Sequence, residues 1–147
     1  MNRFGKLFFV AAVVLVLLSG LGPAAYAEET AQADQAQKGE VVFLLDTSGS
    51  MKKQDKDRQA IDAIRQTAYS LPSSYRTGLV AYNTEIQAVS ALEYDMGQME
   101  ASLEDIRYSG YTNAGEGLIQ AVGLFSGAPD VQRHIIMLSD GEIDMPS

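Results

Sequence analysis

The sequence predicts an α/β domain whose sheet is mostly parallel, is covered by helices and has one antiparallel hairpin at its edge. Two continuous apolar runs, residues 41–45 and 135–138, are typical of strands buried on both faces. Segments with apolar residues at helical spacing lie between the strand-like runs. Two further strand-like runs, residues 77–82 and 85–92, are joined by only two residues, and so short a connection forces antiparallel pairing.

Three helices are expected between these strands. The first spans residues 55–71 and ends at Pro72. Its apolar positions recur at helical spacing at Ile61, Ile64, Ala68 and Leu71. The second is expected over residues 96–108, with an apolar side formed by Met99, Leu103 and Ile106. The third is expected over residues 116–125, with an inward face formed by Leu118, Ile119, Val122 and Phe125.

The last strand is expected over residues 134–139, and its apolar run is typical of a buried, central strand. Such a strand should not remain an open edge, because its unpaired backbone groups would invite association with other chains. We therefore expect further strands and helices of the same domain beyond Ser147, which would make residues 39–147 a domain that lacks its C-terminal part.

The N-terminal segment has the features of a signal peptide. Two basic residues precede an apolar run, residues 7–18, and the tripeptide AYA at residues 25–27 fits a small-x-small cleavage site. Twelve apolar residues are too few to span a bilayer, which takes about 20. We expect residues 1–27 to be removed on export, with an uncleaved anchor as the alternative. Residues 28–38 are polar and predict a short tether before the domain.

The composition excludes several kinds of site and partner. The 147 residues suit one domain, and the absence of Cys rules out disulfides and thiolate metal sites. The 19 acidic residues outnumber the 11 basic ones, which argues against nucleic acid or an anionic membrane surface as the partner. Contact with a membrane is expected only through the signal segment or through an anchor beyond the C-terminus.

Acidic and hydroxyl side chains directly follow two of the expected strands. Asp46, Ser48 and Ser50 form a D-x-S-x-S pattern after the first strand, and residues two apart in an extended loop point the same way. Asp140 follows the last strand. If these strands are neighbours, Asp46 and Asp140 face each other at their carboxyl ends, where open parallel sheets bind ligands. Close carboxylates repel unless a cation lies between them, and a hard cation with oxygen ligands fits best.

Three separated stretches, FLLDTSGSM, GYTN at residues 110–113 and LSDGE, make the sequence resemble a von Willebrand factor A domain, also called an integrin I-type domain. The resemblance extends from about Gly39 to the end of the chain. It implies a doubly wound, Rossmann-like sheet with helices on both faces, and a metal-ion-dependent adhesion site with the pattern D-x-S-x-S…T…D. The positions that match this pattern are Asp46, Ser48, Ser50, Thr112 and Asp140.

The resemblance also implies how such a site works. Ser48 and Ser50 would ligate Mg²⁺ or Mn²⁺ directly, Thr112 would do so in one state of its loop, and both aspartates would act largely through ordered water. Neutral direct ligands leave the charge of the ion partly unneutralised, so an Asp or Glu carboxylate of a protein partner can complete the coordination. The implied function is a divalent-cation-dependent binding or adhesion module outside the cell or at its surface.

An enzyme is the alternative, either a metal-assisted hydrolase or an accessory subunit of a metal chelatase. No catalytic residue is expected, because Asp46 and Asp140 are assigned to the ion and no other general base lies beside the pattern. D-x-S-x-S by itself is common in turns, so the assignment depends on Thr112 and Asp140. The single histidine, His134, is expected to cap or pack in a strand rather than to catalyse.

Overall fold

The computed structural model describes residues 37–142 of the chain. The expected signal peptide at residues 1–27 lies outside this range, as does nearly all of the expected tether at residues 28–38. Within the described residues, no helix is both long enough and apolar enough to cross a membrane.

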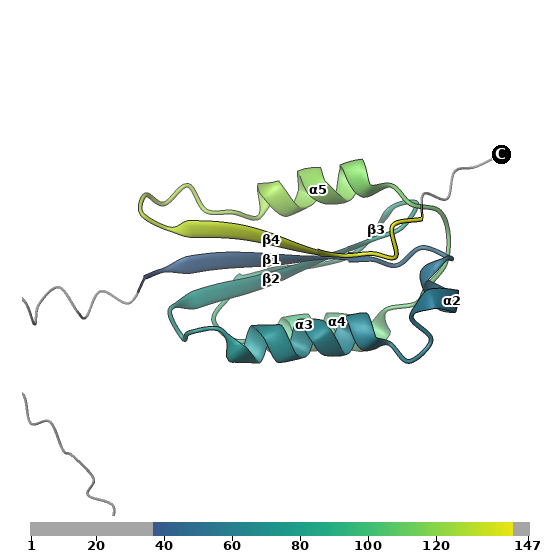
Figure 1. Ribbon diagram of the computed structural model, residues 1–147. Coiled ribbons are helices and arrows are strands. Elements are labelled where there is room, and N and C mark those ends of the chain that lie inside the picture. The colour runs from purple at the N-terminus through teal and green to yellow at the C-terminus, as the bar shows by residue number, and fades with distance from the viewer. Residues whose placement is uncertain (1–36, 143–147) are drawn as a thin grey trace, which may run out of the picture. The chain divides into compact units, whose positions relative to one another are not determined.

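A mixed sheet forms the centre of the described part of the chain (Figure 1). Its four strands are β1 (Gly39–Asp46), β2 (Tyr75–Tyr82), β3 (Ile86–Glu93) and β4 (Gln132–Leu138). They lie in the order β3-β2-β1-β4, with β1 parallel to β2 and β4, and β3 antiparallel to β2. The predicted α/β class, with a mostly parallel sheet and one antiparallel edge strand, is confirmed.

Helices cover both faces of this sheet. The helices are α2 (Met51–Gln54), α3 (Gln59–Ser70), α4 (Gly97–Asp105) and α5 (Ala114–Gly123). Figure 1 shows α3 and α4 on one face and α5 on the other. The fold is therefore the doubly wound, Rossmann-like arrangement that the resemblance implies.

Strand β1 is the centre of two hydrophobic cores, because its side chains alternate between the faces of the sheet. Val41, Phe43 and Leu45 pack in the core that includes α3 and α4. Val42 and Leu44 pack in the core on the α5 side. All eight residues of β1 are buried, as its continuous apolar run predicts.

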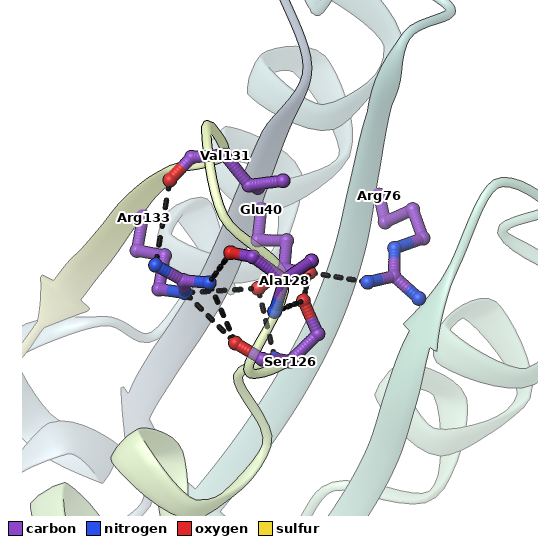
Figure 2. A network of polar contacts seen from close by, with 6 residues as sticks. All are labelled: Glu40, Arg76, Ser126, Ala128, Val131 and Arg133. Carbon is purple, nitrogen blue, oxygen red and sulfur yellow. Dashed lines mark hydrogen bonds and ion pairs between the residues drawn. The ribbon is translucent and has the colours of Figure 1, made fainter.

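A buried charge near the start of β1 joins three parts of the chain (Figure 2). The Glu40 carboxylate accepts hydrogen bonds from Arg76 on β2, and from the backbone N–H (3.0 Å) and the hydroxyl of Ser126. Arg133 on β4 forms an ion pair with Glu40 at 3.5 Å and donates to the Ser126 carbonyl at 2.6 Å. Burial by itself would raise the pKa of Glu40, but the hydrogen bonds from Ser126 and Arg76 outweigh it and lower the pKa.

The first long helix begins later than predicted, at Gln59 rather than at residue 55. The short helix α2 precedes it, and Arg58 has a left-handed backbone with φ of 57°. The Asp55 carboxylate accepts hydrogen bonds from the backbone N–H groups of Gln59 (2.6 Å) and Ala60 (3.2 Å). Asp55 therefore satisfies amides that the first turn of a helix leaves without partners, a role for which aspartate is well suited.

The predicted inward face of the third helix is wrong in most positions. The residues Leu118, Ile119 and Val122 are 41%, 77% and 59% exposed, and only Phe125 of the predicted set packs against the core. The buried residues of α5 are Gly117 and Ala121. A Cβ atom at Gly117 would lie 2.8 Å from Cδ1 of Tyr82, so the helix approaches the sheet through small residues rather than through its large apolar ones.

Among residues 37–142 the last strand is only partly buried, and its central position in a complete domain stays a prediction. β4 lies at the edge of the sheet, with β1 as its one neighbour among residues 37–142. Ile135 packs against the core on the α5 side and Ile136 against the other core, whereas Met137 is 46% exposed. An apolar run predicts a strand but does not encode how many neighbours that strand has.

Candidate metal centre

Three loops meet beyond the carboxyl ends of β1 and β4, at the right-hand end of the sheet in Figure 1. The loops are residues 47–50 after β1, residues 106–113 before α5, and residues 139–142 after β4. Two backbone hydrogen bonds join the first two loops: Ser109 N–H donates to the Thr47 carbonyl at 2.8 Å, and Gly49 N–H donates to the Gly110 carbonyl at 3.0 Å. This is the edge at which open α/β sheets bind ligands.

Asp46, the last residue of β1, is fully buried and connects the first loop to the third. Its Oδ1 accepts a hydrogen bond from the backbone N–H of Ser48 at 2.8 Å. Its Oδ2 accepts a hydrogen bond from the hydroxyl of Ser139 at 2.8 Å. Both carboxylate oxygens of Asp46 thus have protein partners.

The hydroxyls of Ser48 and Ser50 lie side by side, with their oxygens 3.0 Å apart. Both residues are buried. Gly49 lies between them, and a Cβ atom there would be 3.3 Å from the Gly110 carbonyl oxygen, so the loop is closely packed at this point. The two serine hydroxyls thus lie together, while the carboxylate of Asp46 contacts the backbone N–H of Ser48 and the hydroxyl of Ser139.

Asp140 and Thr112 lie in contact with the same short loop. Oδ1 of Asp140 accepts a hydrogen bond from the backbone N–H of Glu142 at 3.0 Å. The Thr112 hydroxyl donates to the Glu142 carbonyl at 3.3 Å. Oδ2 of Asp140 is buried and has no hydrogen-bond partner in the described part of the chain. Four residues of the predicted pattern thus lie on the three joined loops, and the fifth, Asp46, lies at the end of β1.

Sequence reasoning missed two side chains at this site, Ser139 and Tyr82. Ser139 immediately precedes Asp140, and its hydroxyl is the link to Asp46. Tyr82 ends β2, pairs in register with Asp46 and is fully buried. Burial, followed by the charges of Asp46 and Asp140, raises the pKa of Tyr82 to about 12, while the nearby Ser139 hydroxyl opposes the shift. No sequence pattern marks Tyr82 as a site residue. Its place beside Asp46 can be recognised only from the parallel pairing of β1 and β2.

The chemistry of these donors suits a hard divalent cation, because hydroxyl and carboxylate oxygens are hard ligands. Across residues 37–142, no group of three or more His, Cys, Asp or Glu side chains could hold a metal. A cation at the joined loops would therefore depend on hydroxyl groups and water together with the carboxylates of Asp46 and Asp140. The unpartnered Asp140 Oδ2 is a buried acceptor that such a cation or its water would satisfy.

A second tyrosine anchors the middle loop beside the site. The Tyr108 hydroxyl donates to Oδ2 of Asp55 at 2.5 Å. Burial and this hydrogen bond raise the pKa of Tyr108, so the hydroxyl keeps its proton and remains a donor near neutral pH. The same Asp55 carboxylate caps α3, so the loop before α5 is fixed to the start of that helix.

Known proteins of several kinds are similar to this chain. The Collagen alpha-4(VI) chain of Mus musculus is 28% identical over 144 residues, which are 88% of this chain and 6% of that protein. The von Willebrand factor A domain-containing protein 1 of Danio rerio is 33% identical over 117 residues, which are 71% of this chain and 23% of that protein. The chain thus spans less than a quarter of the length of either relative.

Solved structures have the same fold at low sequence identity. The vWF domain of the type V pili tip protein Mfa5 from Porphyromonas gingivalis matches 71% of this chain and 38% of its own, with a TM-score of 0.62 and 23% identity. The SpRpn10 VWA domain matches 74% of this chain and 62% of its own, with a TM-score of 0.53 and 17% identity.

A match to a family model assigns the chain to a family, which the individual similarities to solved structures do not. The model of the von Willebrand factor type A domain matches residues 41–142, which are more than half of the chain and include all three joined loops. Domains of this family often bind a divalent metal. The chain therefore belongs to the von Willebrand factor type A domain family.

Proposed function

We propose that this chain is an exported binding module that recognises a protein, or another carboxylate-bearing ligand, through a bound Mg²⁺ or Mn²⁺ ion. One observation carries the proposal. The buried hydroxyls of Ser48 and Ser50 lie 3.0 Å apart on a loop that Asp46 and Ser139 connect to Asp140, whose Oδ2 has no partner in residues 37–142. These hard oxygen donors support a cation site, because they follow the carboxyl ends of parallel strands, where open α/β sheets bind ligands.

The hydrogen bonds suggest different roles for the five proposed ligands. Both oxygens of Asp46 already accept protein hydrogen bonds, so Asp46 would act mainly through water and as the support of the loop. Ser48 and Ser50 would ligate the ion with their hydroxyls. Asp140 would face the ion or its water with Oδ2. Thr112 would turn from the Glu142 carbonyl towards the ion in one state of its loop.

This ligand set supports a role in binding rather than in catalysis. Mg²⁺ takes about six oxygen ligands and usually keeps several waters, so the few protein oxygens leave positions open to an outside ligand. Neutral hydroxyls do not neutralise the ion, and an anionic oxygen in one open position gains electrostatic attraction in a partly buried site. A carboxylate of a partner protein has the required chemistry.

Export and adhesion are part of the same proposal. The N-terminal residues 1–27 have the pattern of a cleaved signal peptide, and residues 28–38 would tether the domain. Structural neighbours include a type V pili tip protein and a pilus adhesin, SpaC, from Lactobacillus rhamnosus GG. These neighbours support a location outside the cell or at its surface, with a protein as the partner.

The metal site can be tested on the protein without a partner. Mn²⁺ titrated into the wild type in a calorimeter should bind at one site, and saturating Mn²⁺ at about 100 times its Kd should stabilise the fold by about 2.7 kcal/mol. Asp140→Asn should remove both effects, because it removes the charge that faces the ion. Asp62→Asn, on the exposed side of α3, is the matched control and should leave both unchanged. A wild type that binds no Mn²⁺ would contradict the proposal.

A further inference from the structure

The side chain of Tyr82 belongs to the hydrophobic core, yet its hydroxyl lies close enough to Asp46 and Asp140 for their charges to raise its pKa. Tyr82 pairs in register with Asp46 and packs in the core on the α5 side, with Val42 and Leu44. Side chains alternate along β1, so Asp46 projects on the same face as Val42 and Leu44, and therefore on the same face as Tyr82. Gly117 of α5 packs closely against the Tyr82 ring.

Two buried polar atoms near the ends of β2 and β4 lack hydrogen-bond partners among the described residues. In the described part of the chain, the buried side-chain polar atoms without a hydrogen-bond partner are Oη of Tyr82 and Oδ2 of Asp140. The neighbouring Ser139 hydroxyl donates its proton to Asp46 and accepts the backbone N–H of Gly141 at 3.0 Å, so its proton is not available to Oδ2 of Asp140. It lies near the Tyr82 hydroxyl, whose pKa it lowers, but Oη of Tyr82 remains without a hydrogen-bond partner in the described residues. Tyr82 is the register partner of Asp46, and Ser139, the neighbour of Asp140, donates to Asp46. The unpaired donor and the unpaired acceptor therefore lie at the same end of the sheet.

The core does not account for the Tyr82 hydroxyl. A phenylalanine would fill the same space against Gly117 without leaving a buried hydroxyl unpaired, which is costly. Water resolves the problem, because a buried water typically makes about three hydrogen bonds to polar groups that otherwise lack partners. The Tyr82 hydroxyl can donate to such a water, and the water can donate to Oδ2 of Asp140.

We propose that an ordered water joins the Tyr82 hydroxyl to Oδ2 of Asp140, and that Tyr82 thereby positions the Asp140 carboxylate for the cation. The inference rests on the proposed metal site. Oδ1 of Asp140 already accepts a hydrogen bond from the Glu142 N–H. This bond is local, because both residues belong to one short turn in which Gly141 has a left-handed backbone with φ of 77°. Tyr82 supplies a second tether from the rigid sheet. Such outer partners orient ligands and tune affinity.

The test compares two tyrosines at opposite ends of one strand. Tyr82→Phe removes the hydroxyl and keeps the ring, and it should weaken Mn²⁺ binding about tenfold in a calorimetric titration. Its melting temperature without metal should be unchanged or higher, since no protein hydrogen bond is lost. Tyr75→Phe is the matched control at the start of β2, where the hydroxyl donates to Gln132 at 3.4 Å, and its Mn²⁺ affinity should equal that of the wild type.

The ultraviolet absorbance of Tyr82 provides a second measurement. Addition of Mg²⁺ to the wild type should produce an ultraviolet difference spectrum of tyrosine, which Tyr82→Phe loses and Tyr75→Phe keeps. Equal Mn²⁺ affinity of Tyr82→Phe and wild type, or an unchanged difference spectrum in Tyr82→Phe, would overturn the role of Tyr82 while leaving the metal site in place. Absence of Mn²⁺ binding by the wild type would overturn both.

Discussion

The hydroxyl of Ser139 donates a hydrogen bond of 2.8 Å to Oδ2 of Asp46, across 93 residues of sequence. Ser139 follows β4 and Asp46 ends β1, so this bond ties together the loops beyond two neighbouring parallel strands. The other oxygen of Asp46 is held by Ser48 N–H within its own loop. Both oxygens of Asp46 are therefore oriented by hydrogen bonds from the protein itself, which would preorganise the proposed metal site.

Ser139→Ala should weaken this preorganisation. The variant leaves one buried oxygen of Asp46 without its donor, and loss of a hydrogen bond to a charged group should lower the free energy of unfolding by about 2 kcal/mol. Mn²⁺ affinity should fall about tenfold, as for other outer partners of metal sites. Urea denaturation and calorimetry measure the two effects. Ser102→Ala, which removes an exposed hydroxyl within α4, should change neither.

Two glycines of α5 should respond in opposite directions to alanine. Gly117→Ala places a Cβ atom 2.8 Å from the Tyr82 ring and 3.1 Å from Cδ1 of Leu44, so it should destabilise the protein by about 1–3 kcal/mol. Gly123→Ala meets nothing within 4 Å and should stabilise the helix by about 0.5 kcal/mol. Denaturation curves compare the variants directly, and equal effects of the two would contradict the close approach of α5 to the sheet.

The Glu40 network predicts a specific loss of stability in acid. The folded state lowers the pKa of Glu40 below its usual value of 4.5, so the charged form contributes stability that is fully present above about pH 4.5. That stability is lost as the pH falls below 4.5 through the folded pKa, because the folded state must then take up a proton that it binds weakly.

Glu40→Gln should remove this part of the acid sensitivity. At pH 7 the variant should lose about 2 kcal/mol of stability, because its neutral amide replaces a carboxylate bound by Arg76, Arg133 and Ser126. Towards pH 3 its stability should approach that of the wild type. Urea denaturation at several pH values measures the difference, and a constant difference between variant and wild type from pH 7 to pH 3 would contradict the assignment.

The architecture could be predicted because local sequence patterns encode it. A continuous apolar run identified β1 as a strand covered on both faces, and the two-residue link at residues 83–84 identified the antiparallel pair. The site loops could be located because D-x-S-x-S and Asp140 directly follow strands. These features depend on neighbours in the sequence, which is why one sequence suffices.

The errors concern contacts between segments far apart in the chain. Hydrophobicity favoured Leu118 and Ile119 as the inward face of α5, but the Tyr82 ring leaves room only for Gly117. Ser139 and Tyr82 were missed for the same reason. Each acquires its place at the site only through the register of β1 with β4 and with β2, and no local pattern marks that register.

A carboxylate from outside should replace a water on the bound ion, if the site recognises its partner as proposed. Mn²⁺ reports this directly, because its bound waters accelerate the relaxation of solvent protons as they exchange. A short peptide that carries one Glu should lower the relaxation enhancement of the Mn²⁺-loaded protein by displacing a water. The same peptide with Gln should not, since a neutral amide gains far less from an under-neutralised ion.

Thr112→Ala tests whether the loop of residues 106–113 contributes to the binding of the outside carboxylate to the ion. Thr112 donates to the Glu142 carbonyl from a loop that Ser109 and Gly110 hold to the first loop, so its removal should leave the melting temperature without metal within about 2 °C of the wild type. The Glu peptide should bind about tenfold more weakly, because one oxygen ligand of the ion is lost. EDTA should abolish the response in both proteins. If the Glu and Gln peptides act alike, or if the response survives EDTA, the ion does not receive the carboxylate and the partner binds another surface of the domain.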